Sequence, residues 1–305
     1  MKIAVIGAGA MGSIYGGHLS LHNEVYLVDT NQAVVDHLQA NGLVLQESGE
    51  DVVYHPRAVV STEGLGQVDL VILFVKALFS RAALKGNQGL IGENTYVLTL
   101  QNGSGHEDIL SEFVREDHII IGTTEDNGAV LGLGHIRHGG EGRTNIGMLT
   151  EDREGFLPKV KETFDACGFQ VRIHENIQYL IWDKLFTNVS LSAVTGILQV
   201  DMGYIAANAH AWNMTRQLVH EAVAVAAAMG LDFDEIEILE KVKKTSEGSP
   251  NGCTSIRADL RDGRRTEVDT ISGSVVRAAR KCHVSAPTHE FLVEMVHAME
   301  EKDSI

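Results

Sequence analysis

A glycine-rich turn near the start of the chain has the residue types and spacing of a phosphate-binding loop. It reads GAGAMG, which matches the pattern GxGxxG, and it lies between an apolar β-branched run at residues 2–6 and a helical pattern from about 10 to 21. The first glycine would make a tight turn, the second would let the backbone approach a pyrophosphate, and the third would let helix and strand pack closely. A turn that serves packing alone is the alternative. We predict a dinucleotide site made by Gly7, Ala8, Gly9, Ala10, Met11 and Gly12.

An aspartate ends the next apolar run and extends this prediction. Asp29 follows residues 25–28 and stands twenty residues after Gly9. A carboxylate in this place would accept hydrogen bonds from the adenosine ribose and would repel a 2′-phosphate. Neither Lys nor Arg occurs in the next several residues, so NAD(H) is favoured over NADP(H), which stays possible. Asp29 could also cap the helix that is expected to begin near Asn31.

Two further polar residues lie at the ends of predicted strands. Lys76 follows an apolar run at residues 68–75, and Asn102 follows another at residues 95–100. Ligands of doubly wound sheets bind beyond the carboxyl ends of the strands, so both are candidate binding residues. A solvated lysine at a strand end and an ordinary Asn-Gly turn are the structural alternatives.

A polar stripe interrupts an apolar helical segment in the second half of the chain. Lys184, Asn188 and Ser192 are spaced i, i+4 and i+8, which places them on one face of an α-helix. An unpaired buried polar group costs about 1–3 kcal/mol, so such a stripe needs partners, and a substrate site would supply them. The alternative is a solvated amphipathic face with Lys184 exposed.

The first part of the chain alternates strand and helix patterns. Apolar runs at residues 68–75, 95–100 and 118–121 are typical of strands buried on both faces of a parallel sheet. Helical segments are expected near 77–84, 106–114 and 159–167, a hairpin over 43–54, and a last strand at 170–173. The glycine-rich stretch 122–148 is expected to extend the edge of the sheet. We predict an N-terminal Rossmann doubly wound sheet over residues 1–175.

Strand patterns cease after residue 176, and an all-α C-terminal domain is expected over residues 176–305. A length of 305 residues fits two domains of roughly 150 residues each. Residues 246–252 read as a short linker. Helical periodicity covers residues 177–196, 207–229, 234–244, 255–260, 267–282 and 288–300.

Taken in chain order, five short segments resemble the ketopantoate reductase (2-dehydropantoate 2-reductase) family. They are GAGAMG, the strand-end Lys76, the Asn102-Gly103 turn, the Trp-x-Lys-Leu-x-x-Asn segment from Trp182 to Asn188, and Arg265-Thr266-Glu267-Val268-Asp269. The resemblance covers nearly the whole chain. It implies hydride transfer from a reduced nicotinamide to the ketone of a 2-oxo acid, which gives an (R)-2-hydroxy acid.

The resemblance also implies roles for individual residues. Lys184 would be the general acid that protonates the developing alkoxide, and a cationic donor also stabilises the charge on that oxygen. Glu267 would orient Lys184 or hold the substrate hydroxyl. The remaining contacts implied are Asn102 and Asn188 on the substrate, Ser255 on its carboxylate, and Lys76 and Asn102 on both substrate and cofactor. The polar stripe adds Ser192 to the expected substrate contacts.

Two departures from the family pattern bear on specificity. Asp29 and Thr30 stand where better-known members carry a basic residue for the 2′-phosphate, and Ser192 stands where they carry a second asparagine. Both changes favour relatives that resemble NAD-dependent D-2-hydroxyacid dehydrogenases acting on branched or aromatic 2-oxo acids. 2-Dehydropantoate itself stays open as a substrate. So does a non-catalytic dinucleotide sensor, although a sensor has no need of a proton donor.

The composition of the chain limits the kinds of partner that the protein is expected to bind. Acidic residues outnumber basic ones 41 to 25, and a net charge of −16 disfavours nucleic acid and anionic membranes as partners. The three cysteines have no metal-ligand spacing, so we expect no metal and a reducing cytoplasm. The apolar segment 218–229 could be core, which we favour, or could bury a homodimer contact.

Overall fold

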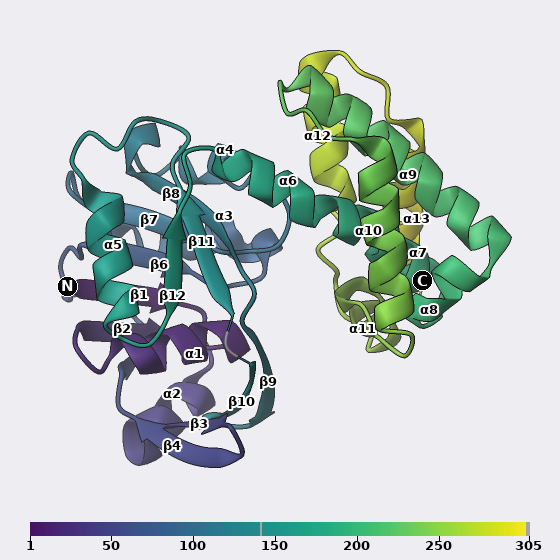
Figure 1. Cartoon of the computed structure of the whole chain (residues 1–305). Helices are drawn as coiled ribbons and strands as arrows, with labels where there is room; N and C mark the ends of the chain where they lie inside the picture. Colours follow the sequence, from purple (N-terminus) through teal and green to yellow (C-terminus); the bar gives the residue numbers. More distant parts are fainter. Residues whose placement is uncertain (141, 303–305) are drawn as a thin grey trace. The chain divides into compact units, whose positions relative to one another are not determined.

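The computed structural model describes residues 1–140 and 142–302, and they form two compact units, each with its own apolar core (Figure 1). The first unit comprises Met1–Gln101 and His106–Gln178. The second comprises the helices from Tyr179 onward together with a four-residue loop, Asn102–Gly105. A sheet unit followed by a helical unit confirms the predicted fold class.

An eight-stranded sheet forms the centre of the first unit, in the order β12-β11-β8-β7-β6-β1-β2-β5. Neighbouring strands are parallel except β11, which runs antiparallel to β8. The central strands β1, β6 and β7 are almost wholly buried, as their unbroken apolar runs predicted. The strands are β1 (Lys2–Ile6), β2 (Glu24–Val28), β5 (Arg57–Val59), β6 (Leu70–Leu73), β7 (Tyr96–Thr99), β8 (Ile119–Thr124), β11 (Arg143–Gly147) and β12 (Gln170–Ile173).

A second, four-stranded sheet has the order β4-β3-β10-β9. Its strands are β3 (Leu43–Glu47), β4 (Glu50–Tyr54), β9 (Asn127–Gly132) and β10 (His135–Gly140). The hairpin β3–β4 was predicted. The expectation that the whole glycine-rich stretch extends the main sheet was wrong for β9 and β10, because β10 pairs with β3 while β11 occupies the place beside β8.

Helices of the first unit connect these strands. The glycine turn leads directly into α1, and Asn31 caps α2 by accepting a hydrogen bond from the Ala33 N–H at 3.1 Å. The segment 106–114 contains only one α-helical turn, shorter than expected. The helices are α1 (Ala10–Leu19), α2 (Gln32–Asn41), α3 (Ser80–Gly86), α4 (Glu107–Leu110), α5 (Phe156–Asp165) and three 3-10 turns at Ala77–Phe79, Gln88–Leu90 and Glu116–His118.

Helices are the only regular secondary structure among the described residues of the second unit. The helices are α6 (Ile177–Thr187), a π-helical turn (Asn188–Ser192), α7 (Ala193–Leu198), α8 (Met202–Ala207), α9 (Ala209–Ala228), α10 (Glu235–Gly248), α11 (Ser255–Arg261), α12 (Ser272–Cys282) and α13 (Pro287–Glu301). Leu218, Val219, Ala222 and Val225 of α9 lie in its apolar core, so the core interpretation of this segment holds. Within the described chain, every helix is too short or too polar to cross a membrane.

Three expected boundaries in this unit were wrong. Asn208 separates α8 from α9, because its side chain accepts hydrogen bonds from two backbone N–H groups of the next turn. Helix α10 continues to Gly248 into the expected linker. Helix α12 begins at Ser272, so Glu267 lies in the turn before it and not in the helix.

Candidate active site

The glycine turn has the geometry that its sequence predicted. Gly7 has φ +104°, a region that favours glycine, and a Cβ on Gly12 would lie 1.8 Å from the Gly7 carbonyl oxygen. A Cβ on Gly9 would meet nothing within 4 Å, so the space beside its backbone is open. Gly9 is also the N-cap residue of α1, and because glycine has no side chain it leaves the first backbone N–H groups of the helix uncapped. The first turn of α1 can therefore direct its N–H groups at a phosphate.

Asp29 fastens this turn to the end of β2. Its Oδ2 accepts the Ala8 N–H at 2.8 Å, and its Oδ1 accepts the Asn31 N–H at 2.9 Å. The cap of α2 is Asn31, so Asp29 is not the N-cap that the sequence left open. Its carboxylate is held in place between the glycine turn and the loop that follows β2.

A cavity of about 430 Å³ opens beside Asp29. It lies at the carboxyl ends of β1 and β2, where a doubly wound sheet binds its ligand. Of its lining residues, the sequence predicted only Gly7 and Asp29 as binding residues, although Val60 and Ser61 directly follow β5. The lining includes Ile6, Gly7, Val28, Asp29, Thr30, Val60, Ser61, Val75, Phe79, Ala82, Ala83, Gly86 and Asn87, and none of these described residues is basic.

Lys76 lies just beyond β6 and is half-buried. It is the N-cap residue of a 3-10 turn, and Gln101 donates a hydrogen bond from Nε2 to the carbonyl oxygen of Val75 at 2.5 Å. The end of β7 thus holds the peptide that precedes Lys76. This contact holds the backbone next to Lys76, which the sequence predicts as a binding residue.

The loop that carries Asn102 is docked on the helical unit. The Ser104 N–H donates to the Thr270 carbonyl oxygen at 3.0 Å, and the Thr270 N–H donates to the Glu267 carbonyl oxygen at 3.1 Å. Gly103, at φ +100°, allows this approach, because a Cβ would lie 2.1 Å from the Thr270 carbonyl oxygen. The loop with the exposed Asn102 therefore lies next to the turn with the half-buried Glu267.

Lys184, Asn188 and Ser192 lie along one continuous helical run, but not with simple α-helical spacing. Lys184 belongs to α6, and the π-helical turn begins at Asn188 and ends at Ser192. The wider turn changes the direction of each side chain relative to the preceding helix, and such turns are frequent at functional sites. Lys184 and Asn188 are half-buried, and Ser192 is buried.

Ser192 and Ser255 come together through Thr254. The Thr254 hydroxyl lies 3.4 Å from the Ser192 carbonyl oxygen and 2.8 Å from the Thr195 hydroxyl. Thr254 also caps α11, whose first residue is the exposed Ser255. The π-helical turn and the start of α11 thus form one connected segment of the helical unit.

Charged residues of α13 hold the Glu267 turn. Glu300 accepts the Thr266 N–H at 2.7 Å and faces the imidazole of His297 at 3.0 Å. Burial opposes the charge of Glu300, but these hydrogen bonds outweigh it and hold the pKa of Glu300 below its usual value. Burial likewise opposes the charge of His297, yet the facing carboxylates Glu300 and Asp269 raise its pKa.

A dinucleotide-binding turn on a doubly wound sheet, followed by a helical unit with a candidate lysine and glutamate, defines the class of nicotinamide-dependent oxidoreductases. Comparison with known proteins agrees with this class. Residues 3–151 match the ketopantoate reductase PanE/ApbA family, and residues 176–300 match the C-terminal part of the same family. The chain belongs to the ketopantoate reductase family, whose members are NAD(P)-dependent enzymes acting on CH–OH groups.

Individual relatives match the whole chain. A 2-dehydropantoate 2-reductase from Streptococcus pyogenes is 30% identical over 302 residues and one from Lactococcus lactis is 33% identical over 309 residues, each aligned over at least 98% of both chains. A ternary structure of D-mandelate dehydrogenase with NADH and anilino(oxo)acetate superposes with a TM-score of 0.90 at 32% identity, covering 100% of both chains. Both kinds of enzyme therefore share this fold throughout.

Proposed function

We propose that this enzyme uses NADH to reduce the ketone of a branched or aromatic 2-oxo acid to an (R)-2-hydroxy acid. The observation that carries the proposal is the full-length similarity to D-mandelate dehydrogenase, solved with NADH and a 2-oxo acid derivative. The relative's ligands belong to that protein. Their transfer to this chain rests on Asp29 and on the residues of the helical unit.

The preference for NADH follows from the surroundings of Asp29. Asp29 and Thr30 both line the 430 Å³ cavity, and the described lining contains no cation to neutralise a 2′-phosphate. A carboxylate accepts hydrogen bonds from ribose hydroxyls and repels a phosphate in the same place. Asp29 therefore supports NADH as the cofactor.

Lys184 is the proposed proton donor. The bound nicotinamide supplies the hydride, and the ketone oxygen that gains negative charge needs a proton. A lysine ammonium both stabilises that charge and donates the proton, which is typically worth a factor of about 10²–10⁴ in rate. Glu267, on a turn held from two sides by Ser104 and Glu300, orients this ammonium or the substrate hydroxyl.

The remaining site residues bind the substrate. We assign Asn102 and Asn188 to the 2-oxo acid, Ser255 to its carboxylate, and Lys76 to the cofactor and substrate. Ser192 is buried at the end of the π-helical turn, where a hydroxyl is shorter than the asparagine amide of better-known members. This shorter side chain supports a substrate without the side-chain hydroxyl of 2-dehydropantoate.

2-Dehydropantoate is the second candidate substrate. The observation that favours it is the name of the curated relatives, which are 2-dehydropantoate 2-reductases at 30–33% identity. This candidate shares the same reaction, proton donor and carboxylate contact. It differs only in the side chain of the acid.

Rates on three 2-oxo acids test the proposal. Oxidation of NADH and NADPH would be followed with phenylglyoxylate, 2-oxoisocaproate and 2-dehydropantoate. We expect the highest kcat/KM with NADH and one of the first two acids. Equal or better use of NADPH would contradict the role of Asp29, and a preference for 2-dehydropantoate would support the second candidate. Dinucleotide binding without oxidation on any acid would overturn the proposed activity.

A further inference from the structure

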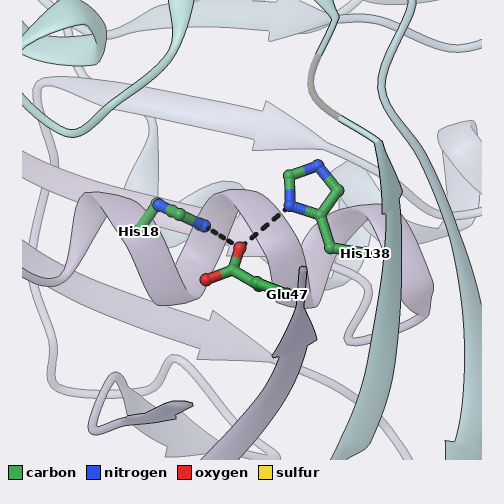
Figure 2. A group of neighbouring side chains, drawn as sticks. All are labelled: His18, Glu47 and His138. Carbon is green, nitrogen blue, oxygen red and sulfur yellow. Dashed lines mark hydrogen bonds and ion pairs between the residues drawn. The ribbon is translucent and has the colours of Figure 1, made fainter. Parts of the chain in front are cut away.

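Three ligand-type side chains from distant parts of the sequence meet in the first unit, outside the site proposed above. His18 comes from the last turn of α1, Glu47 from the end of β3 and His138 from β10 (Figure 2). The Oε1 atom of Glu47 lies 2.6 Å from Nε2 of His18 and 2.9 Å from Nδ1 of His138. One atom from each residue lies within 4.8 Å of the other two.

Each of the three side chains is oriented by a further partner. Nδ1 of His18 lies 3.2 Å from the Cys167 carbonyl oxygen, which can only accept a hydrogen bond. A proton on Nδ1 would leave Nε2, the nitrogen that faces Glu47, available to a metal ion. Carboxylates and carbonyls commonly orient metal-binding histidines in this way, leaving the other ring nitrogen to the metal.

His138 has the same arrangement with the nitrogens exchanged. Its Nε2 lies 3.2 Å from Oδ1 of Asp126, and that carboxylate also accepts the Gly142 N–H at 3.0 Å. Nδ1 of His138 is therefore directed at the cluster. The Tyr54 hydroxyl donates to the second oxygen of Glu47 at 3.0 Å, which leaves Oε1 facing both imidazoles.

The cluster is partly exposed, and two of its ligand-atom separations suit a zinc-sized ion after small movements. His138 lines a cavity of about 670 Å³ together with Gln46, the neighbour of Glu47. Tetrahedral zinc with bonds of about 2.0–2.1 Å separates its ligand atoms by roughly 3.3 Å. The present separations of 2.6 and 2.9 Å would need to widen by less than about 1 Å.

From this geometry we propose that His18, Glu47 and His138 bind a divalent cation of the zinc class. Two imidazoles and one carboxylate form a donor set that suits zinc and the neighbouring transition metals better than magnesium or calcium. The three ligands belong to α1 and to two strands of the small sheet, so the ion fastens this sheet to the helix that follows the phosphate-binding turn. The role is structural, and it is independent of the proposed reaction.

Zinc titration of the whole protein tests the proposal. The protein would be treated with chelator, dialysed, and titrated with Zn²⁺ by calorimetry and with Co²⁺ by its visible d–d absorption. The exposed thiol of Cys253 is a competing surface ligand, so the titrations would use a Cys253→Ser background. The variants are His18→Asn and His138→Asn, with His135→Asn as a control on the same strand, since His135 pairs with Asp51 outside the cluster.

We expect one ion per chain, a tetrahedral Co²⁺ spectrum and a rise in Tm with Zn²⁺. At least a tenfold loss of affinity is expected in His18→Asn and His138→Asn but not in His135→Asn. The Tm of each variant in chelator shows that it is folded. Absence of stoichiometric binding, or equal binding in all three histidine variants, would overturn the proposal and leave the cluster as a protonated imidazole–carboxylate network.

Discussion

Replacing Gly103 by alanine would test whether the Asn102 loop must dock on the helical unit. The new Cβ would lie 2.1 Å from the Thr270 carbonyl oxygen, and the φ of +100° is strained for any other residue. The strained backbone costs about 1–3 kcal/mol. Losing the hydrogen bond from Ser104 to Thr270 costs a further 0.5–1.5 kcal/mol or so. The docked loop is therefore destabilised by about 1.5–4.5 kcal/mol, a factor of roughly 10 to 2,000 in its population.

Steady-state kinetics would measure the consequence. Displacing a positioning residue by about 1 Å can cost roughly 10²-fold in rate, so we expect kcat/KM of Gly103→Ala to fall at least that far. Gly230→Ala is the matched control, since Gly230 has φ +82° in the same unit but its Cβ would meet nothing within 4 Å. A kcat/KM for Gly103→Ala within threefold of that control would refute the docking argument.

Three further variants have defined outcomes. Asp29→Ser combined with Thr30→Arg should raise the KM for NADH about 10- to 100-fold, because charge-assisted hydrogen bonds to the ribose are lost, and should lower the KM for NADPH. An unchanged ratio of the two KM values would contradict the assignment of Asp29 to the ribose. Ser192→Asn should raise kcat/KM for 2-dehydropantoate by about tenfold relative to that for phenylglyoxylate. Because the site is buried, Tm is measured as a control for folding. An unchanged preference would show that Ser192 does not determine substrate specificity. The pKa of Glu300 is depressed on folding, so its stabilisation is complete above its unfolded pKa and is lost as pH falls through the folded value. Glu300→Gln should therefore lower Tm at neutral pH and flatten its decrease in acid, and parallel Tm profiles for both proteins would contradict this.

Local patterns in the sequence predicted much of the sheet unit and its cofactor turn. Gly7, Gly12 and Asp29 act through neighbours in one βαβ unit, so their spacing alone determines the geometry. Apolar runs such as residues 68–75 locate buried strands for the same reason. These features need no knowledge of distant contacts.

Features that depend on long-range pairing were missed. The glycine-rich strands β9 and β10 carry little hydrophobic pattern, and only pairing with β3 assigns them to the second sheet. The docking of Asn102–Gly105 depends on Thr270, far along the chain. His18, Glu47 and His138 lie on three separate elements, so no spacing rule could collect them.

The π-helical turn is a subtler case. The i, i+4, i+8 spacing of Lys184, Asn188 and Ser192 indicated a single α-helical face, and periodicity cannot reveal one wider turn within it. The residue types themselves are what make Lys184, Asn188 and Ser192 candidates for the site. Their relative directions come only from the structure.

Turnover of a Lys184→Ala variant tests the central claim most directly. It would be measured with NADH on the best 2-oxo acid, with NADH affinity determined separately by fluorescence titration. Lys243→Ala, which removes an exposed lysine of α10 paired with Glu247, is the control. We predict a loss of about 10²–10⁴-fold in kcat for Lys184→Ala with unchanged NADH affinity. A kcat within threefold of the Lys243→Ala control would contradict Lys184 as the proton donor.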